Sequence, residues 1–247
     1  MIYGFIGKPR SGKTTLIANI VRKNEQHKKI NELLRFELFS TYDKIYSTDY
    51  IRGTIKIDPY DIGKFKPEEG SCFLIPEAGV WFNNRLYKLV PKHCQDFFAM
   101  HGHYGCDIYW DSQTVNVDKR LRNNCQSLYL VNRFACFSRC VRVVYYITVD
   151  NNTHDLVEGY KIPGLFMKIV DFFWGHYKIL YRPLVYDYFD SFSDQIDWLQ
   201  KDDSHLEYYI DNGERHTWKQ KLMPLVQLLA LIIGWLAAMV IVLMLLL

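Results

Sequence analysis

The segment GKPRSGKT, residues 7–14, restricts the possible folds of this chain more than any other part of the sequence. It matches the pattern G-x-x-x-x-G-K-[ST] at every defined position. A short apolar run at residues 2–6 precedes it, and apolar residues recur at helical spacing over residues 16–21. The sequence therefore predicts a buried strand, a glycine-rich loop and a helix in direct succession.

The residues of this loop are suited to binding a phosphate group. Gly7 and Gly12 let the backbone wrap closely, so that successive N–H groups point inward. The helix that begins near Lys13 adds its positive N-terminal end. Lys13 is expected to reach the β- and γ-phosphates of ATP, and the Thr14 hydroxyl is expected to bind Mg²⁺. The predicted nucleotide-binding residues are Gly7, Lys8, Pro9, Arg10, Ser11, Gly12, Lys13, Thr14 and Thr15.

Further apolar segments alternate with helical stretches along the first two thirds of the chain. The predicted strands lie near residues 44–48, 54–57, 72–75, 108–110, 127–131 and 141–149. Alternating strands and helices indicate an α/β fold with a mostly parallel central sheet flanked by helices. Together with the glycine-rich loop, this predicts a P-loop NTPase. We assign residues 1–149 to this NTPase core and residues 150–223 to an α+β extension with a juxtamembrane segment.

Residues 224–247 form an apolar run without a charged side chain. As a helix this run would measure about 36 Å, enough to cross a hydrocarbon core of about 30 Å. A buried core helix is the alternative interpretation. Arg215, Lys219 and Lys221 precede the run, and positive charges tend to stay on the cytoplasmic side. We therefore expect a single-pass, tail-anchored protein, with its N-terminal domain in the cytoplasm.

Composition adds few constraints to this interpretation. Of the 247 residues, 49% are hydrophobic and 23% are charged, which is typical of a folded globular chain. A net charge of +3 is too small to indicate nucleic-acid binding by itself. The six cysteines include no C-x-x-C pair and no disulfide-framework spacing, so we expect reduced thiols in a cytosolic domain.

A catalytic carboxylate is expected at the end of a strand beside the loop. The apolar strand at residues 72–75 ends in Pro76-Glu77-Ala78. Proline stands where this type of site carries the Asp that holds magnesium, and a proline side chain cannot coordinate a cation. Glu77 is placed to orient the attacking water or to bind Mg²⁺ itself, whereas the alternative is a solvated turn carboxylate.

Two further types of side chain could act on the γ-phosphate. Gln113 closes the next strand, where it could sense the γ-phosphate or merely cap a turn. Arginines could act in trans as arginine fingers if the protein forms a ring, or could serve as surface ion-pair partners. The candidate arginines are Arg85, Arg120, Arg122 and Arg133. Arg120 and Arg122 are the better candidates because they follow Gln113 closely.

The order of three segments, GKPRSGKTT, LIPEAGVWFNNR and FAMHGHYGCDIYWDSQTVNVDKRLRNN, resembles the zonular occludens toxin family. That family comprises the morphogenesis ATPases of filamentous bacteriophages. The resemblance covers about residues 1–192, and Pro76 and Gly102 depart from the family pattern. The family motifs correspond to Glu77-Ala78, Arg85, His101 and His103, Asp107-Ile108, Gln113 and Arg122.

The resemblance implies an inner-membrane, ring-forming ATPase that drives coat subunits from the membrane onto extruding phage DNA. The implied partners are further copies of this chain, phage coat and other assembly proteins, single-stranded phage DNA and the lipid bilayer. In this interpretation Glu77, Gln113 and Arg122 are catalytic, and Thr14 and Glu77 hold Mg²⁺. The alternative is a nucleotide-binding structural scaffold with little or no ATP turnover, which Pro76 favours. A small-molecule kinase is a weaker third interpretation, because no segment reads as an acceptor-site lid.

Overall fold

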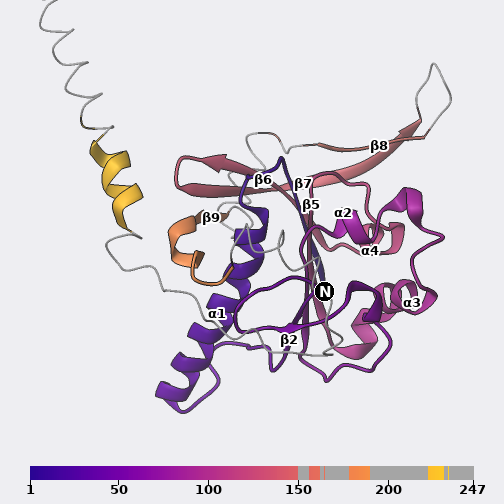
Figure 1. Ribbon diagram of the computed structural model, residues 1–247, viewed down its shortest axis with the longest axis horizontal. Helices are drawn as coiled ribbons and strands as arrows, with labels where there is room; N and C mark the ends of the chain where they lie inside the picture. Colours follow the sequence, from indigo (N-terminus) through magenta and orange to yellow (C-terminus); the bar gives the residue numbers. More distant parts are fainter. Residues whose placement is uncertain (150–155, 162–163, 165–177, 190–221, 231–232, 234–247) are drawn as a thin grey trace, which may run out of the picture.

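The computed structural model describes residues 1–149, 156–161, 164, 178–189, 222–230 and 233. These residues build one mostly parallel sheet with helices on both of its faces (Figure 1). The α/β fold and the parallel central sheet predicted from the sequence are thus confirmed.

The described strands form a single mixed sheet. Its order is β3-β2-β4-β5-β1-β6-β7-β8, and β9 pairs with β7. The strands are β1 Ile2–Ile6, β2 Ile45–Ser47, β3 Ile55–Lys56, β4 Cys72–Ile75, β5 Asp107–Ser112, β6 Ser127–Phe134, β7 Phe137–Val149, β8 Leu156–Lys161 and β9 Lys178–Tyr181. Strands β1 to β6 pair in parallel, and β7 runs antiparallel to β6, β8 and β9.

The strand order places β5 between β1 and β4, although β4 precedes β5 in the chain. Phe5 of β1 pairs with Asp111 of β5, and Ile75 of β4 pairs with Trp110 of β5. The carboxyl ends of these three parallel strands therefore meet at one edge of the sheet. In open α/β sheets, ligands bind at this edge.

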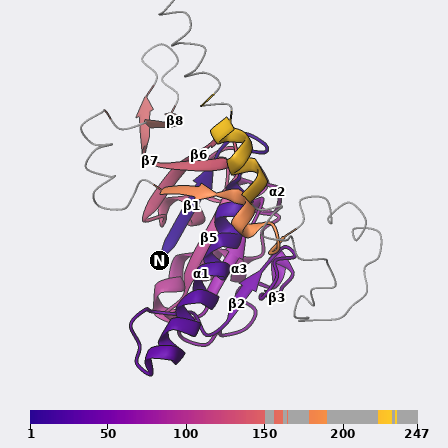
Figure 2. The ribbon, with the colours of Figure 1, turned by 90° about the vertical axis from the view of Figure 1, so that its left-hand side faces the viewer.

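Helices cover the two faces of the sheet unequally. The longest, α1, lies on one face, and the shorter helices α2, α3 and α4 lie on the other (Figures 1 and 2). The α-helices are α1 Lys13–Leu34, α2 Ala78–Trp81, α3 Lys92–Met100 and α4 Lys119–Asn123, and the 3-10 helices are η1 Pro59–Asp61, η2 Asn84–Leu86, η3 His101–Tyr104 and η4 Arg182–Val185.

Two hydrophobic cores hold these layers together. Ile2 and Ile6 of β1 pack into one core with Phe98 of α3. Phe5 of β1 packs into the other core with Ile17 of α1. Successive side chains of a strand point to opposite faces, so β1 contributes to both cores. Burial in two cores fixes the strand and helix on either side of the glycine-rich loop.

The expected strands all occur, with small differences in their ends. The strand predicted at residues 108–110 runs from Asp107 to Ser112 and so includes Asp111. In the region assigned to an extension, β9 pairs with β7. Leu180 of β9 and Val185 of η4 also belong to the core against α1. Strands β8 and β9 of this region therefore extend the same sheet, and most of residues 150–223 lies outside the described part.

Residues 222–230 and 233 are helical and mark the start of the apolar C-terminal run (Figure 1). Met223, Val226 and Leu229 are each more than half exposed, at 56%, 56% and 51%. Among the described residues, no helix combines the length and the apolarity needed to cross a bilayer. Most of residues 224–247 lies outside the described part, so the membrane helix stays a prediction.

Candidate nucleotide-binding site

The glycine-rich loop joins the end of β1 to the first turn of α1, as the sequence predicts. Arg10 and Gly12 adopt left-handed backbone conformations, with φ of 61° and 92°. Left-handed residues alternating with others turn successive N–H groups to one side, which forms an anion-binding concavity. The Gly7 N–H donates to the Ser112 carbonyl at 3.3 Å, and this bond ties the loop to the end of β5.

Both loop glycines are required by close packing. A Cβ on Gly7 would lie 2.5 Å from the Val131 carbonyl oxygen, and one on Gly12 would lie 1.9 Å from Ser138 Oγ. The Ser138 hydroxyl donates to the Ser11 carbonyl at 3.1 Å. Strands β6 and β7 therefore support the loop from behind, and side chains larger than glycine do not fit at either position.

The start of α1 presents polar groups to the loop. Backbone hydrogen bonding into α1 begins with the Leu16 N–H and the Gly12 carbonyl, at 3.1 Å. The amides that precede Leu16 have no acceptor within the helix, and the helix dipole makes this end positive. Ser11 Oγ is buried without a hydrogen-bond partner in the described structure. A bound phosphate would satisfy such groups, so the loop fits an anionic ligand.

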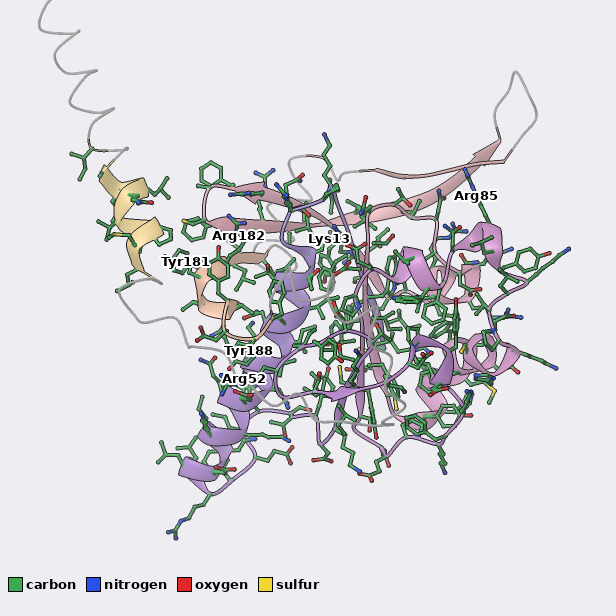
Figure 3. All side chains as sticks on the ribbon, in the orientation of Figure 1. Lys13, Arg52, Arg85, Tyr181, Arg182 and Tyr188 are labelled. Carbon is green, nitrogen blue, oxygen red and sulfur yellow. The ribbon has the colours of Figure 1, made fainter. Side chains whose placement is uncertain are left out.

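Lys13 is held against the loop and is nearly inaccessible to solvent. Its side chain is 4% exposed, and its Nζ donates to the Lys8 carbonyl at 3.3 Å. Figure 3 shows Lys13 at the N-terminal end of α1, beside the ends of the central strands. A buried ammonium group that donates to a neutral carbonyl can still attract phosphate oxygens strongly.

Asp111 of β5 is a site residue that the sequence alone does not reveal. It is completely buried. Its Oδ2 accepts a hydrogen bond from Thr14 Oγ1 at 3.2 Å, and its Oδ1 accepts from the Glu77 N–H at 3.1 Å. One carboxylate thus links the first turn of α1 to the residue that follows β4.

The surroundings of Asp111 disfavour its negative charge. Burial raises the pKa of Asp111 to about 7, and the nearby Glu77 carboxylate contributes in the same direction. Lys13 and the hydrogen bonds from Thr14 and the Glu77 N–H act in the opposite direction. Carboxyl groups with such raised pKa values are concentrated at functional sites.

Glu77 follows β4 in an unusual backbone conformation. Its φ of 49° lies in the left-handed region, which is uncommon for a residue with a side chain. The neighbouring Gly79 lies so close to β5 that a Cβ there would be 2.5 Å from Ser112 Oγ. The start of α2 is thus packed against the end of β5, and this contact places Glu77 next to the loop.

The other predicted catalytic residues are placed differently. Gln113 follows β5 and is exposed, next to Ser112, whose carbonyl accepts from the loop. Arg122 of α4 is buried, with 4% exposure, and its Nη1 donates to the Val115 carbonyl at 3.2 Å. Arg85 points outward from η2 (Figure 3). The structure therefore brings residues 7–15, Glu77 and Gln113 to one edge, and it places Arg85 outside this group and Arg122 within the protein.

The sequence of this chain matches a known protein family over most of its length. The model of the family described as Zonular occludens toxin (Zot) matches residues 1–191. The chain belongs to this family. The resemblance seen in the motif order is thereby confirmed, over nearly the same range. A search among curated proteins finds no match.

Two solved structures are among those similar to this chain. The N-terminal domain of zonular occludens toxin from Neisseria meningitidis is 17% identical, with a TM-score of 0.43, over 69% of this chain and 96% of that one. The genome packaging NTPase from Sulfolobus turreted icosahedral virus 2, in complex with ATP-gammaS, is 14% identical. Its TM-score is 0.34, over 66% of this chain and 98% of that one. The family assignment rests on the sequence match over residues 1–191.

The signal that could have revealed Asp111 is present in the sequence but is not local. Asp111 follows the apolar residues Tyr109 and Trp110 of its strand, whereas a proline follows the apolar residues of β4. Only the order of the strands shows that β5 lies between β1 and β4, with Asp111 beside the loop. Strand order depends on contacts between segments that are distant in the chain, which motif spacing does not report.

Proposed function

We propose that this member of the zonular occludens toxin family is a membrane-anchored ATPase that drives assembly and extrusion of filamentous phage virions through the host inner membrane. The observation that carries the proposal is the loop between β1 and α1, with left-handed Arg10 and Gly12, the buried Lys13 and the Thr14 hydroxyl. A loop of this kind before a helix binds the phosphates of a nucleotide in P-loop proteins.

The residues of the site fit ATP with Mg²⁺. The loop amides and Lys13 would hold the β- and γ-phosphates. The Thr14 hydroxyl and the Glu77 carboxylate offer oxygen atoms, the ligand type that Mg²⁺ prefers. The bound ion would offset negative charge that develops on the phosphates. Glu77 would orient the attacking water, and Gln113 would reach the γ-phosphate.

A role for Arg122 in a neighbouring subunit would require a change of conformation. Its guanidinium group donates to the Val115 carbonyl inside the protein. An arginine finger must instead project into the site of the next subunit of a ring. In the proposed ring, Arg122 therefore becomes available only if α4 moves outward on assembly.

The membrane part of the proposal is supported by the C-terminal sequence. Residues 224–247 carry no charged side chain, and the helix at the start of this run exposes Val226 and Leu229, with Met223 exposed just before the run. Exposed apolar side chains on a helix favour contact with another apolar surface. We propose that this segment crosses the inner membrane and keeps the ATPase in the cytoplasm. There, a homo-oligomeric ring would act on coat proteins, other assembly proteins and single-stranded phage DNA.

A second candidate function is a nucleotide-binding scaffold of the assembly machinery. Pro76 favours it, because this buried residue occupies the position of the expected magnesium carboxylate. Such a scaffold would bind ATP and oligomerise, with little or no hydrolysis.

Replacing the loop lysine tests the proposal. In Lys13→Ala we expect loss of ATP binding, measured with a fluorescent ATP analogue on the purified full chain, and loss of virion release from infected cells. Lys64→Ala is the control, because Lys64 is exposed and pairs with Asp61 away from the loop. ATP binding or virion release at the normal level in Lys13→Ala would overturn the proposal.

A further inference from the structure

The proposed site lacks a carboxylate where β4 ends but has one on the neighbouring strand. Pro76 follows β4 and offers no side-chain oxygen. Ile75 pairs with Trp110, so the next position along β5 is Asp111. A carboxylate is thus supplied at the same edge of the sheet, one strand closer to β1.

Asp111 is also aligned with the strand that carries the loop. It pairs with Phe5 of β1, and its Oδ2 lies 3.2 Å from Thr14 Oγ1. In P-loop NTPases the magnesium ion is held by the loop Ser or Thr together with an Asp at the end of a strand. Asp111 accepts a hydrogen bond from Thr14, which is the loop threonine expected to bind magnesium.

The burial of Asp111 points to a function for its charge. A buried carboxylate is costly unless it is paired with a cation or is well hydrogen-bonded. Its nearest charged neighbours are the Glu77 carboxylate and Lys13. The Lys13 ammonium donates to the Lys8 carbonyl. Accepting hydrogen bonds from Thr14 and the Glu77 N–H does not require a full negative charge, so this charge is available to a bound cation.

We propose that Asp111, acting with Thr14, supplies the carboxylate that holds the magnesium ion of the bound nucleotide, directly or through a water molecule. This inference rests on the proposed nucleotide site. It moves the metal-binding carboxylate from the position after β4 to β5, and it leaves Glu77 free to orient water. Proline at position 76, where this type of site carries an Asp, is then compatible with ATP hydrolysis.

The test compares nucleotide affinity with and without the metal. A fluorescent ADP analogue is titrated into the full chain in detergent, first with Mg²⁺ and then with a chelator. In the wild-type protein Mg²⁺ should tighten binding at least about tenfold. In Asp111→Asn this gain should be lost, whereas binding in the chelator should be at least as tight as in the wild-type protein, because one negative charge has been removed.

Asp107→Asn is the matched control, since Asp107 lies at the opposite end of β5 and contacts the N-terminal amine. It should keep the full effect of Mg²⁺. Mn²⁺ provides a second readout, because its electron paramagnetic resonance signal reports binding directly. Mn²⁺ affinity in the presence of ADP should fall at least about tenfold in Asp111→Asn and should stay unchanged in Asp107→Asn.

A rescue variant separates loss of the carboxylate from damage to the fold. Adding Pro76→Asp to Asp111→Asn returns a carboxylate to the sheet edge, and we expect the Mg²⁺ effect to return. An unaltered Mg²⁺ effect in Asp111→Asn, or a folded double variant without the effect, would overturn the inference. Failure of the wild-type protein to bind nucleotide in either condition would instead overturn the proposed function.

Discussion

The Thr14 hydroxyl donates a hydrogen bond to Asp111 Oδ2 across 3.2 Å, and this contact joins the first turn of α1 to the end of β5. The same carboxylate accepts from the Glu77 N–H after β4. Three segments that are far apart in the sequence are thus connected through one buried side chain. Because Asp111 contacts all three segments, the protonation and the metal binding of its carboxylate are the properties that best test this site.

The first prediction concerns stability and pH in the absence of nucleotide and metal. The pKa of Asp111 is raised from its ordinary value of 3.8 to about 7, so the folded chain binds this proton more tightly than the unfolded chain. The contribution of Asp111 to stability is therefore complete below about pH 4 and is lost as the pH rises through 7. Asp111→Asn should gain stability relative to the wild-type protein over this range, by at most about 4 kcal/mol.

Thermal unfolding between pH 4 and pH 8 measures this difference. Burial is the largest cause of the raised pKa of Asp111, and the neighbouring groups that modify this pKa, Glu77, Lys13 and Thr14, all remain in the Asp111→Asn variant. The exposed Asp96→Asn corrects for the general effect of removing an aspartate. A stability difference between Asp111→Asn and the wild-type protein that does not change with pH would contradict the prediction.

The second prediction separates an ATPase from a scaffold. If Glu77 orients the attacking water, Glu77→Gln should lower steady-state phosphate release by about a hundredfold or more while ATP binding is retained. A scaffold should show equally low phosphate release with either residue. Phosphate release by the purified full chain is the measurement, and the exposed Glu37→Gln is the control. An undiminished rate in Glu77→Gln would exclude Glu77 as the catalytic base.

The loop residues of this site can be predicted from the sequence, whereas Asp111 cannot. Gly7, Gly12, Lys13 and Thr14 follow a short pattern whose structure depends mainly on its own residues and on the flanking strand and helix. Asp111 lies beside the loop because β5 is placed between β1 and β4, and this strand order results from packing between distant segments.

The burial of Arg122 is a similar case. It depends on how α4 packs, with the guanidinium group reaching the Val115 carbonyl. Its position shortly after Gln113 in the sequence favours an arginine finger, with a surface ion pair as the alternative, and neither interpretation predicts a buried side chain. The sequence carries no direct sign of this tertiary contact.

The third prediction tests the packing behind the loop. Gly12→Ala places a Cβ 1.9 Å from Ser138 Oγ and forces alanine into a conformation with φ of 92°. The left-handed backbone alone costs about 1–2 kcal/mol. We expect weaker nucleotide binding and a lower unfolding temperature. Gly102→Ala is the control, because no atom of another described part of the chain lies within 4 Å of the added carbon. Equal unfolding temperatures for the two variants would show that the loop tolerates the displacement of Ser138.

The fourth prediction concerns whether Arg122 stabilises the fold or acts on a neighbouring subunit. Arg122→Ala removes the donor to the Val115 carbonyl and leaves a gap beside buried residues. Loss of such a bond should cost about 1–3 kcal/mol of the free energy of unfolding, measured on the chain without nucleotide. The exposed Arg120→Ala should change it by about 0.5 kcal/mol or less. If Arg122→Ala instead unfolds at the wild-type temperature but no longer hydrolyses ATP, Arg122 acts in catalysis, and α4 must move outward when the ring assembles.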